Sequence, residues 1–226
     1  MGRTDDRDSP TKIIDTVLEL LESDGYEAVQ LREVARRARV SLTTVYKLYP
    51  TRDDLILAAV ERWMAANAYA PLPEPTADEC LRDGLLRLLR SVFEPWERHP
   101  RMLKAFYLAR SSVRGARRLD KQGFDAILPA AGVLLADLDS DYVADVGLVL
   151  TNMTYALIGR FADDSLEITE VLPALERIVY RLTANNEHLA APPHRRPGSP
   201  QTLVLRPSFV SPYDPDSGTA GGAATL

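Results

Sequence analysis

Two short helical patterns, at residues 31–38 and about 42–49, are separated only by residues 39–41, and this spacing constrains the N-terminal part of the chain more than any other feature. Side chains suited to a small apolar core between two such helices occur at Val34, Val40, Val45 and Leu48. Ala35 is small enough for their point of closest approach, and Ser41 is a preferred N-cap for the second helix. Because two helices joined by three or four residues can place the second one in the major groove of DNA, the pattern predicts a helix-turn-helix near residues 31–50.

The charge of this segment differs from that of the whole chain. The net charge of −5 argues at first against binding to DNA, but residues 32–52 contain only one acidic residue, Glu33, and have a local net charge of +5. The basic residues are Arg32, Arg36, Arg37, Arg39, Lys47 and Arg52. A local basic patch can attract phosphate, although a run of charges is also typical of a solvated helix face.

Helical signals extend on both sides of this segment. Ser9 and Pro10 are typical of a helix start, and Gly25 is placed to end that first helix. Thr51 can cap a fourth helix that continues through Trp63 toward Tyr69. Five further helical patterns follow at about 76–98, 101–110, 116–136, 141–161 and 166–186. No convincing alternation typical of strands is present, so we expect an all-α protein.

Composition divides the chain into four parts. Residues 1–8 are expected to be a disordered arm, 9–52 the helix-turn-helix domain and 53–186 a helical core. Pro71, Pro73 and Pro75 predict a stiff linker inside that core. Residues 187–226 are rich in proline, glycine, serine and alanine, which predicts a mostly disordered tail.

Several function classes find no support in the sequence. One cysteine, Cys80, and three histidines, His99, His188 and His194, provide no metal-ligand cluster. No glycine-rich phosphate loop or nucleophile motif is present, so we predict neither an enzyme nor a cofactor. A polar N-terminus, a single cysteine and no run of 18 uninterrupted apolar residues predict a cytoplasmic protein outside the membrane.

The N-terminal stretch also resembles a known family. Gly25–Ala28, Leu31–Ser41 and Thr44–Leu55 together resemble the DNA-binding domain of the TetR family over about residues 11–60. The resemblance implies an all-α homodimer with an N-terminal DNA-binding head and a C-terminal core for ligand binding and dimerisation. It also implies a repressor that a small molecule releases from a palindromic operator.

The resemblance carries over to individual positions. The DNA-contacting residues that it implies, together with the cap, are Arg32, Ser41, Leu42, Thr43, Thr44, Tyr46, Lys47 and Arg52. Two residues depart from the family pattern. Gln30 stands where the family usually has a threonine cap, and Arg39 stands where the turn usually has glycine. If Arg39 is left-handed, its side chain costs about 1 kcal/mol.

Beyond residue 60 the resemblance fades, although residues 94–106 faintly resemble actinobacterial regulators of steroid and lipid catabolism. Aromatic, methionine and polar residues of the core are candidates for contact with a small apolar or amphipathic effector of the lipid, sterol or acyl thioester type: Trp96, Met102, Phe106, Tyr107, Arg110, Asn152, Met153 and Tyr155. Aromatic and methionine residues at helical spacing are, however, more often ordinary core. Arg110 and Arg160 could meet an anionic ligand or could lie on a solvated surface.

The last two helical patterns, 141–161 and 166–186, carry more apolar surface than one helix pair can bury, which predicts a four-helix dimer interface. Two alternatives remain open. One is a DNA-binding regulator gated by a protein partner through the proline-rich tail, and the other is a helical enzyme.

Overall fold

The computed structural model describes residues 9–70, 72, 79–136 and 138–186, and within these ranges it is all-α, as predicted. The predicted arm (1–8), the linker prolines and the predicted tail (187–226) lie outside the described residues. The helices are α1 (Ser9–Ser23), α2 (Leu31–Ala38), α3 (Leu42–Leu48), α4 (Arg52–Ala66), α5 (Leu81–Arg98), α6 (Pro100–Arg110), α7 (Val113–Leu135), α8 (Ser140–Ala162) and α9 (Ile168–Thr183).

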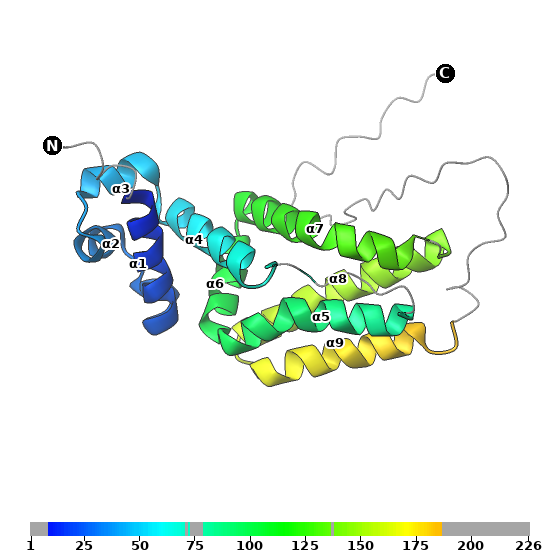
Figure 1. Ribbon diagram of the computed structural model, residues 1–226. Helices are drawn as coiled ribbons and strands as arrows, with labels where there is room; N and C mark the ends of the chain where they lie inside the picture. Colours follow the sequence, from blue (N-terminus) through cyan, green and yellow to red (C-terminus); the bar gives the residue numbers. More distant parts are fainter. Residues whose placement is uncertain (1–8, 71, 73–78, 137, 187–226) are drawn as a thin grey trace, which may run out of the picture.

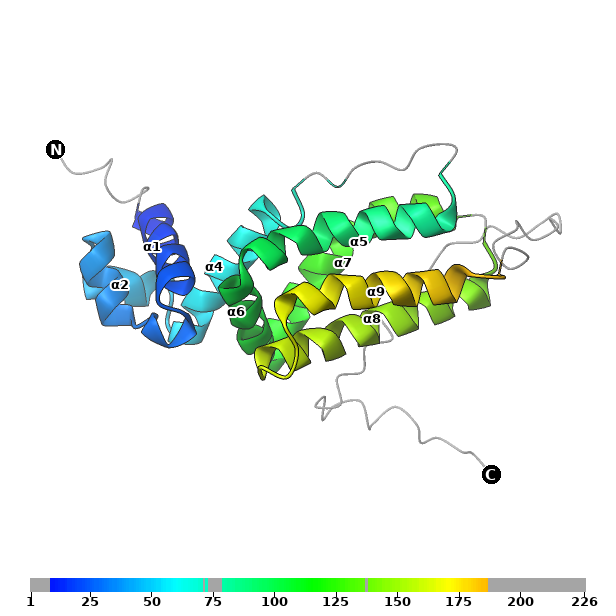
Figure 2. The same cartoon turned by 90° about the horizontal axis from the view of Figure 1, so that it is seen from below.

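The helices form a small head and a longer bundle (Figures 1 and 2). Helices α1, α2 and α3 cluster at one end, α4 leads away from them, and α5, α7, α8 and α9 run side by side. Helix α6 crosses the end of this bundle that faces the head. The predicted helical segments therefore all exist, with ends shifted by a few residues.

The ends of the short helices follow from local hydrogen bonds. Ser41 Oγ accepts a bond from the amide of Thr44 at 3.0 Å, and Thr51 Oγ1 accepts one from the amide of Asp54 at 3.0 Å. Both predicted caps are thus confirmed, whereas Gln30 makes no side-chain cap bond to α2. Gly25, at φ 85°, ends α1 with its amide 3.0 Å from the carbonyl oxygen of Leu20. The short 3-10 turn that follows, Tyr26–Ala28, was not predicted.

Helix α4 contributes to a core shared by the head and the bundle. Its buried residues are Leu55, Ile56, Leu57, Ala59, Val60, Trp63 and Met64. The ring centroid of Trp63 lies 4.4 Å from that of Trp96 on α5, and the ring of Trp96 lies 5.4 Å from that of Phe106 on α6. One continuous apolar cluster therefore runs from α1 across α4 to α9.

Several prolines and one glycine lie within the helices of the bundle. Pro95, Pro129 and Pro173 each lie inside one continuous helix, α5, α7 and α9 respectively. Gly84 on α5 faces Leu134 on α7 so closely that a methyl group in its place would clash with the leucine side chain. A glycine at this position lets the two helices approach.

One helix in the described part of the chain, α8, is long and apolar enough to cross a membrane by length and composition alone. The sequence criterion of 18 uninterrupted apolar residues did not identify this helix. Helices in the core of water-soluble proteins meet the same criterion, and α8 packs against α6 and α9.

The turn between α2 and α3 gives the first testable prediction. Arg39 adopts the left-handed conformation, φ 56° and ψ 41°, in which a side chain costs about 1 kcal/mol. Arg39→Gly should therefore raise the free energy of unfolding by about 0.5–1 kcal/mol and the melting temperature by about 2–4 °C. Arg39→Ala keeps the strain and serves as the control in thermal unfolding. Equal stability of the two variants would contradict the strain argument.

Candidate DNA-binding surface

Helix α3 has one buried residue and several exposed polar residues. Val45 is fully buried, whereas Thr43, Tyr46 and Lys47 are exposed, with 49% of Tyr46 accessible. Leu42 and Thr44 are half-buried. Three of the predicted contact residues of this helix, Thr43, Tyr46 and Lys47, are therefore accessible to a partner of the head.

The hydroxyl groups next to α3 are already engaged with each other. Ser41 Oγ lies 2.7 Å from Thr44 Oγ1, in addition to accepting the Thr44 amide. Both hydroxyls are exposed, so each keeps capacity for one more hydrogen bond. Such a pair can meet a phosphate oxygen while it holds the start of the helix.

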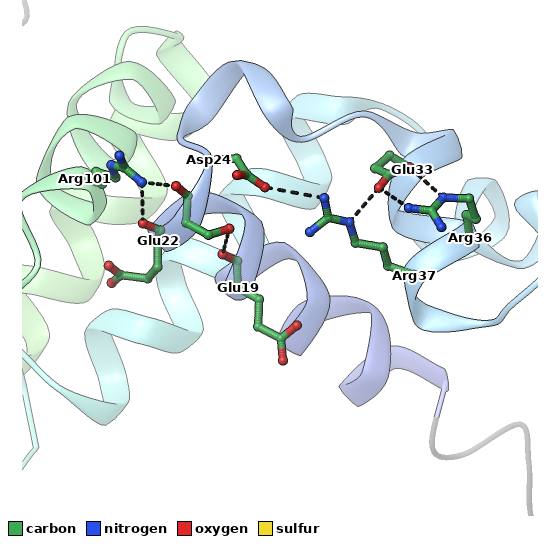
Figure 3. A network of polar contacts seen from close by, with 8 residues as sticks. Glu19, Glu22, Asp24, Glu33, Arg36, Arg37 and Arg101 are labelled. Atoms are coloured by element: carbon green, nitrogen blue, oxygen red, sulfur yellow. Dashed lines mark hydrogen bonds and ion pairs between the residues drawn. The ribbon is translucent and has the colours of Figure 1, made fainter.

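Two of the predicted basic residues are partly neutralised within the protein. Arg36 donates to both carboxylate oxygens of Glu33 at 2.9 and 2.6 Å, and Arg37 donates to Glu33 Oε1 at 2.6 Å (Figure 3). Arg37 also reaches Asp24 Oδ2 at the end of α1, at 3.4 Å. Hydrogen bonds from Arg36 and then Arg37 lower the pKa of Glu33 to about 2, so Glu33 stays charged. Arg36 and Arg37 are thus engaged with acidic side chains of the protein itself.

The side chain of Arg52 binds backbone carbonyl groups within the protein, which the sequence did not indicate. Its Nε donates to the Val29 carbonyl oxygen at 2.7 Å, and its Nη2 donates to the Tyr26 carbonyl oxygen at 2.6 Å. The guanidinium also lies 4.6 Å from the ring centroid of Tyr26 and 3.3 Å from a carboxylate oxygen of Glu27. Arg52 therefore ties the start of α4 to the turn that precedes α2.

Three cations remain directed to solvent around α3. Arg32, Arg39 and Lys47 are exposed, and no ion pair or side-chain hydrogen bond is found for them among the described residues. Together with Tyr46 they offer charge and hydrogen-bond donors to an anionic partner. Phosphate backbones are recognised by such residues, and base edges by the side chains that enter the groove.

Polar contacts also fix the head onto the bundle. Arg101 at the start of α6 donates to the Glu22 carbonyl oxygen at 2.9 Å and to the carbonyl oxygen of Ser23 (Figure 3). Next to it, His99 Nδ1 lies 2.8 Å from Glu22 Oε1. The Arg101 bonds satisfy carbonyl groups at the C-terminus of α1, and the His99 contact adds a second link between α1 and the start of α6.

The eight candidate effector residues do not gather in one place. Trp96, Met102 and Phe106 are buried in the shared core. Tyr107 is 38% exposed and packs against Gly159 on α8. Asn152 and Met153 are exposed on α8.

The remaining two candidates do meet, around a residue that the sequence analysis missed. Arg110 donates to the two carboxylate oxygens of Asp120 at 2.7 and 2.9 Å, and the hydroxyl of Tyr155 donates to Asp120 at 2.7 Å. The guanidinium of Arg110 stacks 3.7 Å from the ring centroid of Tyr155. Burial, and then the charge of Asp120, raise the pKa of Tyr155, so its hydroxyl stays protonated. Asp120 therefore compensates the charge of Arg110. Arg160, the other arginine considered for an anionic ligand, donates to the Ser165 carbonyl oxygen.

Two clefts in the described structure lie elsewhere. A narrow one of about 80 Å³ lies where Tyr26 and the start of α4 face the corner between α6 and α7, with Asp54 and Arg114 on its wall. An open groove of about 580 Å³ lies between α4 and α7. None of the eight candidate effector residues lines either cleft.

Known proteins share this architecture and parts of this sequence. Residues 13–59 match the family described as bacterial regulatory proteins, tetR family, and residues 79–182 match the tetracyclin repressor-like C-terminal domain. A crystal structure of a TetR transcriptional regulator from Rhodococcus sp. RHA1 aligns with a TM-score of 0.62 at 20% identity, over 83% of this chain and 100% of that one. A second TetR-like regulator from the same organism aligns at 0.54 and 19% identity, over 78% and 96%.

Curated relatives are similar over shorter stretches. The HTH-type transcriptional repressor KstR of Mycolicibacterium smegmatis is 32% identical over 123 residues, which are 51% of this chain and 58% of that protein. KstR of Mycobacterium tuberculosis is 36% identical over 62 residues, 27% of this chain and 28% of that protein. The alignments thus span less than two thirds of these relatives. The family matches nevertheless include both the helix-turn-helix and the helical bundle, and the chain belongs to the TetR family of bacterial regulatory proteins.

Proposed function

We propose that this protein is a cytoplasmic transcriptional repressor that binds a short palindromic DNA operator through α3 and is released by a small apolar or amphipathic effector. The observation that carries DNA binding is the surface of α3, where Tyr46 and Lys47 are exposed within a helix-turn-helix. Arg32 and Arg39 flank this surface as further solvent-directed cations. The similarity to repressors named KstR supports repression as the outcome of DNA binding.

We infer different tasks for different residues of this surface. Thr43, Tyr46 and Lys47 are on the exposed side of α3, where side chains can enter a major groove. Arg32, Arg39, Ser41 and Thr44 lie around that helix and suit contacts with phosphate, which position the protein on the duplex without reading its sequence. Arg52 supports the head from within, because its donors already bind the carbonyl oxygens of Tyr26 and Val29.

The first experiment separates these roles. Tyr46→Ala and Lys47→Ala should each weaken binding to the DNA upstream of the protein's own gene by about 1–3 kcal/mol, while the melting temperature stays unchanged. Arg98→Ala removes an exposed cation remote from α3 and is the matched control. Gel-shift titrations at several salt concentrations provide the measurement, and affinity should fall steeply with salt because bound phosphates release counterions. Full affinity in a folded double variant at Tyr46 and Lys47 would refute the assignment.

For Arg52 we expect substitution to lower the stability of the protein. Replacing it with alanine leaves the carbonyl groups of Tyr26 and Val29 without their donors, so Arg52→Ala should destabilise the protein by about 1–3 kcal/mol. Any loss of operator affinity should then accompany a lower melting temperature. A thermal unfolding curve that matches the wild type, with weakened DNA binding, would instead make Arg52 a direct phosphate contact.

The proposal includes a homodimer built on α8 and α9. Only 28% of the most apolar window of α8 is buried within one subunit, and Leu148 on this helix is 49% exposed. Tyr180 on the neighbouring helix α9 is 52% exposed. A second copy that packs these helices against its own would bury this apolar surface and set two α3 helices one DNA turn or a multiple apart.

The dimer is tested by a charge placed in the expected interface. Leu148→Glu together with Tyr180→Glu should convert a dimer into a monomer in light scattering at micromolar concentration, because two buried carboxylates would lack partners. Operator affinity should fall with it. Val133→Glu changes an equally apolar side chain, 65% exposed on α7, and should leave the dimer intact. A monomeric wild-type protein would refute the interface.

A further inference from the structure

The carboxylate of Glu33 on α2 is held between two arginines of the same helix (Figure 3). Arg36 directs Nε and Nη2 to the two carboxylate oxygens, at 2.9 and 2.6 Å, and Arg37 directs Nε to one of them at 2.6 Å. Two parallel N–H donors are also the geometry with which a guanidinium binds a phosphate group. Glu33 therefore occupies the edge of Arg36 that could otherwise bind a DNA phosphate.

Arg36 is the middle member of a row of cations. Arg32 precedes it by four residues and so lies on the same face of α2, and Arg39 follows it by three residues at the C-cap. All three residues are exposed, and 70% of the Arg36 side chain is accessible. Arg32 and Arg39 have no ion pair among the described residues, whereas the charge of Arg36 is compensated by Glu33.

The compensation of Arg36 depends on this one carboxylate. Glu33 is the only acidic residue between residues 32 and 52, and the hydrogen bonds from Arg36 and Arg37 lower its pKa to about 2, which keeps it ionised. Arg37 also reaches Asp24 Oδ2 at 3.4 Å. Loss of the Glu33 charge would thus leave Arg37 with one acidic partner and Arg36 with none in the described part of the chain.

The balance of charges decides what Arg36 contributes to DNA binding. If Arg36 exchanged Glu33 for a phosphate, it would break one ion pair for each one that it forms. The carboxylate would then lie near the phosphates with less compensation, and like charges repel. An exposed pair of this kind contributes little to folding, so its charge can be removed without loss of the fold. The net contribution of Arg36 to DNA affinity is therefore small while Glu33 is ionised.

We propose that Glu33 withholds Arg36 from the DNA backbone and thereby lowers the sequence-independent part of the affinity of the head for DNA. The inference rests on the proposed function, because it concerns the duplex that α3 is proposed to bind. Phosphate contacts supply nearly all of the affinity for DNA without an operator, and such DNA competes with the operator. Glu33 is thus a positioning residue that limits how tightly the head holds any duplex.

The salt dependence of DNA binding tests this role. Glu33→Gln should bind a random-sequence duplex severalfold more tightly at low salt, and its log–log slope of affinity against salt should be steeper by about 0.9, the value for one added phosphate contact. Glu27→Gln is the matched control, because it removes another exposed carboxylate of the head whose partner, Arg52, keeps its carbonyl bonds. The slope of this control should equal that of the wild type. Thermal unfolding confirms that each variant is folded, and Glu33→Ala is a second variant with the same expected slope.

Two double variants with the net charge of the wild type identify the arginine. Glu33→Gln combined with Arg36→Ala should return the affinity and the slope to the wild-type values, whereas Glu33→Gln combined with Arg37→Ala should keep the steeper slope. A wild-type slope in folded Glu33→Gln and Glu33→Ala would overturn the proposal. So would a gain that persists when Arg36 is also replaced.

Binding of the wild type to the two kinds of DNA separates this proposal from the proposed function. A wild-type protein that binds neither the random duplex nor the DNA upstream of its own gene would refute the proposed function. Tight binding of the upstream DNA, with no effect of Glu33→Gln on the slope, would refute only the role of Glu33.

Discussion

The burial of α4 is the constraint on which the rest of the structure depends. This helix supplies apolar side chains to the head and to the bundle at once, and Trp63 near its end stacks on Trp96 of α5. A helix that is buried on several sides cannot rotate without disturbing both cores, because protein interiors are close-packed. The head and the bundle therefore share one packed core through α4, which contacts α1 on one side and α6 and α7 on the other.

Polar contacts along α4 join it to the head and to α7. At its start, Arg52 holds the turn before α2 and Asp54 holds Arg114 of α7. Near its end, the Glu61 carbonyl oxygen receives Gln122. Arg101 and His99, at the start of α6, bind the last residues of α1. The head is thus attached to α6 through α1 and to α7 through α4.

The polar cluster inside the bundle is satisfied by its own members. Arg110, Asp120 and Tyr155 satisfy one another, and the pairing of Arg110 with Asp120 is only 15% exposed on each side chain. Removing one member would leave a buried charge uncompensated. The cluster is therefore a rigid support between α6, α7 and α8. On the same helix α7, the side-chain oxygen of Gln122 is buried without a hydrogen-bond partner among the described residues.

The sequence by itself determined the helices, the helix-turn-helix and its caps. Periodicity, Ser41, Thr51 and Gly25 act within a few residues of their own position, so their effects can be read locally. Only the tertiary structure decided what the long polar side chains do. Arg52 and Arg110 were candidates for external ligands, yet they bind Val29 and Asp120, and the Gln122 acceptor became an isolated buried atom beside α4. The reason is physical: a guanidinium or an amide at the end of a flexible side chain binds whichever partner the packing of distant helices brings within 3 Å, and that partner is not specified by neighbours in the chain.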